Sequence, residues 1–507
     1  MRPAGRAILF NKAPLARFGV QQMLDVYQLL MKRILFAILC GVLGAAIAVS
    51  LITVIYLGNR PDLKPWHEVI LDGEFSTDSP VSDINGYLAI ETRLFRQLKE
   101  RIVDRLPPAK RDPINRYHRG SLTDPGRCEN NWNRTFELTA AEPVAGILLL
   151  HGMSDSPYSL RALGQRLNEN GAWVLGLRLP GHGTIPSGLV RITWEDMAAA
   201  VRLAMRHMRT QLGDKPLYII GYSTGGALAV EYALEQIDGD GQLPPADRLV
   251  LISPAIGVSR MAALAVWQGR LGRWLGIDKL LWNTIQPEYN SYKYTSFAIN
   301  AGEQVSRLTT AIQQRIRRAR QSGTLSRFPP VLTFQSVVDA TVSTPAIITG
   351  LYRQLVNPGN ALVLFDINRH TAIDSLMTRD PLSSILPLIA SGENRYNVSL
   401  VTNESRSSRR VAVVSYADSR PLQPPRPLDG SWPAGVHSLS HIALPFPEDD
   451  PLYGDADTGT CPGITLGKIV LLGERGVINI PANEILRLRW NPFYPYLKQR
   501  VMAFLDL

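Results

Sequence analysis

Residues 216–226 read PLYIIGYSTGG, an apolar run that leads directly into a serine between glycines. Gly221-Tyr222-Ser223-Thr224-Gly225 has the form G-x-S-x-G, and the helical pattern TGGALAVEYALEQI begins at Thr224. The motif alone is weak, because glycine and serine are common residues. Its position is informative, because glycines flanking a serine at a strand-to-helix junction allow a sharp turn that exposes the hydroxyl. The stretch therefore predicts that Ser223 is a nucleophile.

Short apolar runs alternate with helical patterns on both sides of this motif. The runs are GILLL (146–150), AWVLGLRL (172–179), RLVLISPA (248–255), PVLTFQS (330–336) and ALVLFDI (361–367). Strands that are apolar throughout are buried on both faces, as in a parallel sheet with helices on each side. The predicted fold class is therefore α/β, with a mostly parallel sheet covered by helices.

The net charge of the 507-residue chain is +10, but its distribution argues against nucleic acid as a partner. Residues 1–33 contain six lysines and arginines and one aspartate, a net of +5, so half of the excess precedes the first long apolar run. The remaining excess is spread over more than four hundred residues, where short basic clusters are typical of solvated faces.

That apolar run, ILFAILCGVLGAAIAVSLITVIYLG, occupies residues 34–58 and contains no charged residue. As a helix it would be about 37 Å long, enough to cross a hydrocarbon layer of about 30 Å. It predicts a transmembrane signal anchor, with residues 1–33 as a basic cytoplasmic tail. Basic flanks stay on the cytoplasmic side, so the chain after residue 58 is expected outside the cytoplasm, which is the periplasm in a Gram-negative bacterium.

Three stretches in order resemble the α/β-hydrolase superfamily, in the branch of lysophospholipases, monoacylglycerol lipases and serine aminopeptidases. They are GILLLHGMSDSPYSLRALGQRL (146–167), LRLPGHGT (177–184) and GYSTGG (221–226). The resemblance covers roughly residues 133–370. It implies an N-terminal extension over 59–132 and an α/β-hydrolase domain over 133–507. The domain would hold a helical lid at about 256–328 and a long insert at about 371–490 before the C-terminal helix.

The resemblance also implies the roles of several site residues. Ser223 matches the nucleophile, and the backbone N–H groups of Met153 and Thr224 match the donors of an oxyanion hole. His151 and His182 match histidines that structure loops. The implied chemistry is attack on an ester carbonyl, giving an acyl-enzyme that water then cleaves, with no cofactor and no metal.

The acid and the base of the site come from the later part of the chain. Asp339 follows an apolar run, and its D-x-x-V motif resembles the acid loop of the superfamily, whereas Asp366 lies within a predicted strand and is the poorer candidate. Three histidines remain open for the base. We favour His441, in an apolar loop suited to cover an imidazole; His370 is the alternative that a plain α/β-hydrolase would use, and His437 is the third.

The expected substrate is a small-molecule or lipid ester, as for an esterase or lysophospholipase. Aromatic residues between 267 and 297, in the expected lid, suit an acyl or aromatic group. An aminopeptidase is the first alternative, and it would need an acidic lid residue, such as Glu288 or Glu303, to hold the substrate ammonium. The second alternative is a hydrolase-fold module that binds without catalysis. The oligomeric state stays open.

The chain has three cysteines, and Cys40 falls in the predicted membrane segment. Cys128 and Cys461 would lie in an oxidising compartment, where either a disulfide or two separate thiols could form.

Overall fold

The computed structural model describes residues 15–107, 112–239, 242–257, 272–370, 377–389, 395–417, 420–421, 424–455, 461–469, 484 and 486–507. The chain divides into two compact units, Met1–Pro61 and Asp62–Leu507. Each unit is described by itself below.

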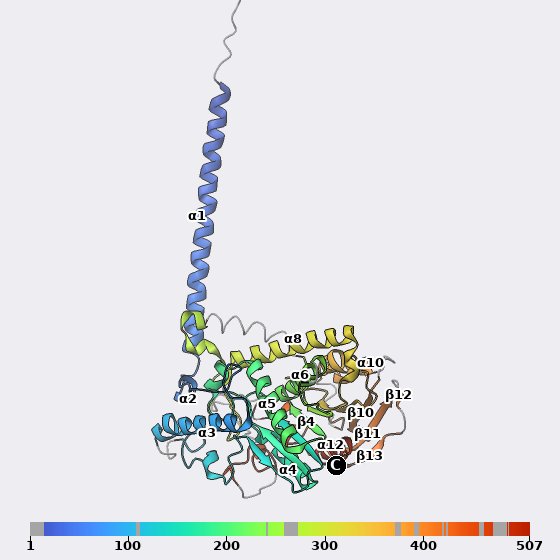
Figure 1. Cartoon of the computed structure of the whole chain (residues 1–507). Helices are drawn as coiled ribbons and strands as arrows, with labels where there is room; N and C mark the ends of the chain where they lie inside the picture. The colour runs from blue at the N-terminus through green and yellow to red at the C-terminus, as the bar shows by residue number, and fades with distance from the viewer. Residues whose placement is uncertain are drawn as a thin grey trace, which may run out of the picture. The chain divides into compact units, whose positions relative to one another are not determined.

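The first unit is dominated by helix α1 (Leu15–Gly58), drawn in dark blue in Figure 1. The helix begins well before Ile34, where the predicted membrane segment starts. Its part Gln22–Gly58 is long and apolar enough to cross a membrane, a property that a signal sequence near an N-terminus shares. Most of the large apolar side chains along this part are exposed.

The second unit contains a sheet of eleven strands in the part of the chain that the structure describes, and most neighbouring strands are parallel. The strand order is β1-β3-β2-β4-β5-β8-β9-β10-β11-β12, and β13 also pairs with β11. Strands β3 to β10 of this order run parallel, while β1 and the strands beyond β10 pair antiparallel. The strands are β1 (Phe136–Leu138), β2 (Ala145–Leu150), β3 (Ala172–Leu177), β4 (Leu217–Tyr222), β5 (Arg248–Ile252), β8 (Val331–Ser336), β9 (Ala361–Phe365), β10 (Asn397–Asn403), β11 (Arg410–Ala417), β12 (Arg420–Pro421) and β13 (Arg426–Ser431).

Helices cover both faces of this sheet (Figure 1). On one face, α5 (Trp194–Leu212) and α6 (Thr224–Asp238) pack against the strands, and α3 (Ile84–Arg101) and α8 (Ile299–Ser322) belong to the same hydrophobic core, with α8 packed on α6. The other face packs against α4 (Tyr158–Glu169) and the C-terminal helix α12 (Tyr494–Leu505). The five apolar runs at 146–150, 172–179, 248–255, 330–336 and 361–367 all contain strands, which confirms the predicted α/β class.

The predicted insert at about 371–490 enlarges the sheet, which the sequence did not indicate. Strands β10 to β13 come from it and extend the sheet beyond β9, at the orange end in Figure 1. β10 pairs in parallel with β9, and β11 turns back along it. Parts of the insert and residues 258–271 of the expected lid lie outside the described residues, so the extent of both segments stays a prediction.

The remaining described elements are short. They are α2 (Pro65–Glu68), α9 (Thr344–Ile347), α10 (Leu386–Ile389), a two-stranded sheet of β6 (Trp282–Thr284) and β7 (Phe297–Ala298), a π-helical turn at Ile348–Tyr352, and 3₁₀ turns at Val103–Arg105, Pro125–Arg127, Pro186–Val190, Asp278–Leu281, Thr324–Arg327, Pro381–Ser384, His441–Ala443 and Leu466–Lys468.

A disulfide joins Cys128 of the N-terminal extension to Cys461 of the insert, 333 residues apart in the sequence. Cys40 is a free cysteine on α1. The bond settles the alternative left open by the sequence, and it ties together two segments that both lie outside the repeating strand–helix pattern.

We expect Cys461→Ser to lower the free energy of unfolding by about 2–5 kcal/mol, because a cross-link across a long loop restricts the unfolded chain. The measurement is denaturant unfolding of the purified chain with and without reductant. Cys40→Ser is the matched control and should leave the midpoint unchanged. Equal midpoints for Cys461→Ser and the unmodified chain would contradict the prediction.

Candidate active site

Ser223 occupies the sharp turn between β4 and α6. Its backbone φ is +53° and ψ is −114°, a conformation that a residue with a side chain rarely adopts. The neighbouring glycines are required by close backbone approaches, because a Cβ on Gly221 would lie 2.4 Å from the Gly225 carbonyl oxygen and one on Gly225 would lie 2.0 Å from that of Leu150. The tight turn presents the serine hydroxyl at the carboxyl end of the sheet, where α/β folds bind ligands.

His441 lies between the serine and Asp339. Its Nε2 is 3.1 Å from the Ser223 Oγ, and its Nδ1 is 2.7 Å from an Asp339 carboxylate oxygen. An ionised carboxylate only accepts hydrogen bonds, so Nδ1 carries the proton and donates it to Asp339. Nε2 is then free to accept the proton of the serine hydroxyl. All three side chains are held away from bulk solvent.

Asp339 follows β8 and is anchored by its own loop. One carboxylate oxygen accepts the backbone N–H groups of Thr341 at 2.8 Å and Val342 at 2.9 Å. Burial alone would raise the pKa of Asp339, but the His441 imidazole and these amides lower it by more, so the pKa lies below its usual value. The carboxylate is therefore charged and ready to orient the imidazole.

Two contacts at this site had no signal in the sequence. Gln335, on β8, donates its side-chain N–H to Asp339 at 3.1 Å. Tyr222 packs its ring beside that of His441, with 5.4 Å between the ring centroids, and donates its hydroxyl to the His441 carbonyl at 3.4 Å. Tyr222 is the second residue of the G-x-S-x-G motif, but the motif does not restrict that position to an aromatic residue.

The other candidates for the acid and the base lie elsewhere. The Nδ1 of His370 is 3.2 Å from the Arg406 carbonyl oxygen, and the side chain is exposed. His437 is half-buried, and its carbonyl accepts a backbone bond from Asn368. Asp366 forms two 2.8 Å contacts with the guanidinium of Arg369. None of the three has a contact with Ser223 among the described residues.

The two candidate oxyanion donors belong to residues that line the same cavity as the serine. Thr224 is the first residue of α6, so its N–H has no acceptor within the helix. Met153 follows the His-Gly pair after β2, and both residues line the cavity that contains Ser223. Two amides beside a nucleophile can stabilise a negative oxygen when both point into the same cavity.

His151 is the first residue after β2, and its ring packs against that of His182. The Leu179 N–H donates to His151 Nε2 at 3.0 Å, so the His151 proton is on Nδ1, which donates to the Gly152 carbonyl at 2.8 Å. Burial lowers the pKa of both histidines, that of His182 to about 3. Both are therefore neutral residues that order loops.

The cavity around Ser223 has a volume of about 520 Å³. Its described lining is largely apolar and carries no carboxylate. The lining residues are Gly152, Met153, Ser154, Tyr222, Ser223, Thr224, Ala255, Asn283, Lys293, Phe297, Ile299, Gly302, Val305, Thr341, Val342, His441, Ile442 and Arg487. Of the aromatic residues expected in the lid, Phe297 lines this cavity and Trp274 is exposed. Trp267 lies outside the described residues, and the remaining four are buried: Trp282, Tyr289, Tyr292 and Tyr294.

The two acidic lid residues considered for an ammonium site are engaged away from this cavity. Glu288 is buried and accepts the backbone N–H groups of Thr295 and Ser296. Glu303 pairs with Arg273 at 3.7 Å. An adjoining cavity of about 210 Å³ contains two carboxylates, and each has a cation within 4 Å. Asp155 lies beside Lys293, and Glu484 lies beside Arg487.

A sequence model of the family described as serine aminopeptidase, S33, matches residues 141–371, the range that contains β2, the Ser223 turn and Asp339. The chain is a serine hydrolase of the α/β-hydrolase fold. This hydrolase is 26% identical over 234 residues to the thermostable monoacylglycerol lipase of Bacillus sp. (strain H-257), covering 45% of this chain and 80% of that protein.

Solved structures similar to this hydrolase include one of the metagenome-derived lipolytic enzymes LipS and LipT. It is 21% identical, with a TM-score of 0.37, and the alignment covers 46% of this chain and 88% of that one. The monoacylglycerol lipase of Paleococcus ferrophilus is 20% identical, with a TM-score of 0.34, and the alignment covers 46% of this chain and 87% of that one.

Proposed function

We propose that this hydrolase cleaves carboxylic esters of small molecules or lipids through Ser223, His441 and Asp339. The observation that carries the proposal is the continuous hydrogen-bonded series from Asp339 through His441 to Ser223, at the wall of a mostly apolar cavity. The order of the three residues in the chain, serine, acid and then histidine, is that of the α/β-hydrolases.

The geometry supports a two-step reaction. His441 Nε2 takes the serine proton as Ser223 Oγ attacks the ester carbonyl, and Asp339 stabilises the imidazolium that forms. The N–H groups of Met153 and Thr224 hold the oxyanion of the tetrahedral intermediate. His441 then gives its proton to the leaving alcohol. Water, activated by the same imidazole, attacks the acyl-enzyme and releases the acid.

Two observations favour an ester over a peptide substrate. The described lining of the cavity is largely apolar and has no carboxylate to hold a substrate ammonium, while Glu288 and Glu303 are engaged elsewhere. The relative that is 26% identical is a monoacylglycerol lipase, which acts on esters. A cavity of a few hundred Å³ with an apolar wall suits an acyl chain.

The test is a substrate comparison with the full-length chain in detergent. We expect hydrolysis of p-nitrophenyl esters and of monoacylglycerol, labelling by a fluorophosphonate, and turnover of aminoacyl p-nitroanilides at least about 100-fold slower than of esters. Faster turnover of the anilides would support the peptidase instead. Neither labelling nor turnover would support the non-catalytic binding module.

We also propose that residues 34–58 anchor the enzyme in a membrane, with residues 1–33 in the cytoplasm and the catalytic unit outside. The basic flank favours this orientation. The Cys128–Cys461 disulfide fits an oxidising compartment on the far side of the membrane.

A reporter that is active only outside the cytoplasm, fused after Leu507, is expected to be active in cells. The matched control is a reporter active only in the cytoplasm, at the same position, which is expected to be silent. An N-terminal tag should remain on the full-length chain in the membrane fraction. The reverse reporter pattern would contradict the orientation, and loss of the tag would identify a cleaved signal sequence.

A further inference from the structure

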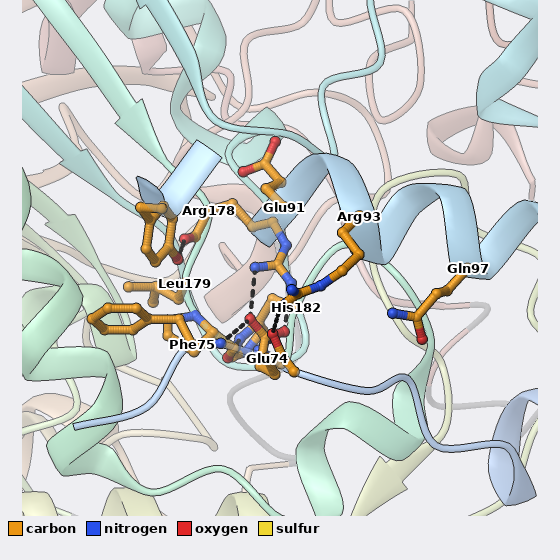
Figure 2. A network of polar contacts seen from close by, with 12 residues as sticks. Glu74, Phe75, Glu91, Arg93, Gln97, Arg178, Leu179 and His182 are labelled. Carbon is orange, nitrogen blue, oxygen red and sulfur yellow. Dashed lines mark hydrogen bonds and ion pairs between the residues drawn. The ribbon is translucent and has the colours of Figure 1, made fainter. Parts of the chain in front are cut away.

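A partly buried charge network connects the N-terminal extension to the loop after β3 (Figure 2). One oxygen of Glu74 lies 2.5 Å from a guanidinium nitrogen of Arg178 and also accepts the Gly181 N–H at 2.9 Å. Its second oxygen lies 3.3 Å from the other terminal nitrogen of Arg178. The Arg178 side chain is buried, so its charge requires an anion nearby. One carboxylate therefore contacts both ends of the stretch 178–181, whose backbone also bonds Thr135, Tyr87 and Tyr294.

Leu179, in the middle of this stretch, contacts His151. The Leu179 N–H donates to His151 Nε2, which leaves the imidazole proton on Nδ1 for the Gly152 carbonyl. The ring also packs edge-on against His182, with 4.9 Å between centroids. The position of the 178–181 loop therefore determines where His151 directs its N–H group.

The carbonyl that His151 contacts belongs to the peptide unit between Gly152 and Met153. Because this unit is planar and trans, a bond that fixes the direction of the Gly152 C=O also fixes the Met153 N–H, which points the opposite way. The unit is adjacent to the nucleophile, since a Cβ on Gly152 would lie 3.2 Å from the Ser223 Cβ. The Met153 N–H is one of the two candidate oxyanion donors.

We propose that Glu74 is a positioning residue for the oxyanion hole. It acts through the 178–181 loop and His151 to hold the Met153 N–H in the direction that the oxyanion requires. The inference rests on the proposed function, in which this amide stabilises the tetrahedral intermediate. It places a determinant of the reaction rate in the N-terminal extension, before residue 141, where the family match begins.

Glu91 on α3 provides a matched control. Like Glu74, it belongs to the extension and is close enough to Arg178 for their charges to interact. It is buried, and both of its oxygens accept the Thr135 N–H at 3.2 Å. The described hydrogen bonds of Glu91 do not include residues 179–181, and Glu91 reaches the stretch only through Thr135, whose hydroxyl accepts the Arg178 N–H at 3.0 Å. The change Glu91→Gln removes a negative charge near the buried guanidinium of Arg178 but leaves the hydrogen bond between the Gly181 N–H and Glu74 in place.

The experiment compares full-length Glu74→Ala, Glu74→Gln and Glu91→Gln with the unmodified enzyme. The readouts are kcat and KM for a p-nitrophenyl ester, the affinity for a trifluoromethyl ketone and the melting temperature. The ketone adds to the serine as a hemiketal whose oxyanion occupies the same hole. A donor displaced by about 1 Å costs up to about 10²-fold in rate.

For Glu74→Ala we expect kcat to fall about 10- to 100-fold, KM to change less than about threefold, and affinity for the ketone to fall in parallel with kcat. Glu74→Gln keeps an acceptor for the Gly181 N–H, so its loss should be smaller. Glu91→Gln should lower the melting temperature while kcat stays within about twofold. If Glu74→Ala does not fold, the comparison of Glu74→Gln with Glu91→Gln decides the question.

The inference is overturned if the Glu74 variants keep kcat within about twofold, or if Glu91→Gln lowers kcat and ketone affinity equally, because the network would then contribute only stability. Failure of the proposed function gives a different result. In that case the unmodified enzyme itself is not labelled by a fluorophosphonate and does not hydrolyse the ester.

Discussion

Ser223→Ala is expected to lower kcat for ester hydrolysis by about 10⁴-fold or more and to abolish fluorophosphonate labelling. The change removes one oxygen at the wall of the cavity, 3.1 Å from His441 Nε2, and leaves the turn and the flanking glycines in place. Serine and alanine both carry a Cβ, so the strain of the positive φ at this position is unchanged and we expect little change of the melting temperature. The measurements are steady-state kinetics, labelling and thermal unfolding.

Ser253→Ala is the matched control for this variant. Ser253 follows the neighbouring strand β5, is buried and also has a positive φ, 45°. It is not among the described residues that line the cavity. We expect its kcat to stay within about threefold of the unmodified enzyme. Activity of Ser223→Ala within about tenfold of the unmodified enzyme would mean that another residue is the nucleophile.

His441→Ala is expected to lower kcat by about 10³- to 10⁴-fold, because no other described side chain can take the serine proton at this place. The fold should persist, since Asp339 keeps the N–H groups of Thr341 and Val342 and the amide of Gln335. The measurements are the rates of ester hydrolysis and of fluorophosphonate labelling, both of which need the general base.

The controls are His370→Ala and His437→Ala. Like His441, both residues follow β9 in the chain. Among the described residues, neither contacts Ser223. We expect both variants to retain kcat within about threefold. An active His441→Ala together with an inactive His370→Ala would reverse the assignment. The insert would then contribute no catalytic residue.

The features that follow from neighbouring residues could be predicted from the sequence. Apolar runs separated by helical patterns indicated the parallel sheet, because a strand buried on both faces needs apolar residues at successive positions. The turn at Ser223 was predictable for a similar reason. The glycines that permit its close contacts, Gly221 and Gly225, are two residues away on either side.

Features that depend on distant parts of the chain were harder to infer. The sequence placed β10 and β11 only within an insert, because the pairing of β10 with β9 depends on which edge of the sheet is free. The pairing of Cys128 with Cys461 stayed open, because two cysteines have no local pattern that records their separation in space. Glu74 belongs to no recognisable sequence motif, because its partners Arg178 and Gly181 lie more than a hundred residues away.

By itself, then, the sequence determined the α/β class, the nucleophile motif and the apolar segment 34–58, all of which are encoded in the order of adjacent residues. The tertiary structure decided which histidine lies beside the serine. His441 is 218 positions from Ser223, while His370 is nearer in the chain and follows the rule for a plain α/β-hydrolase. Only the folded path of the insert, which returns to the carboxyl end of the sheet, brings His441 within hydrogen-bonding distance of both Ser223 and Asp339.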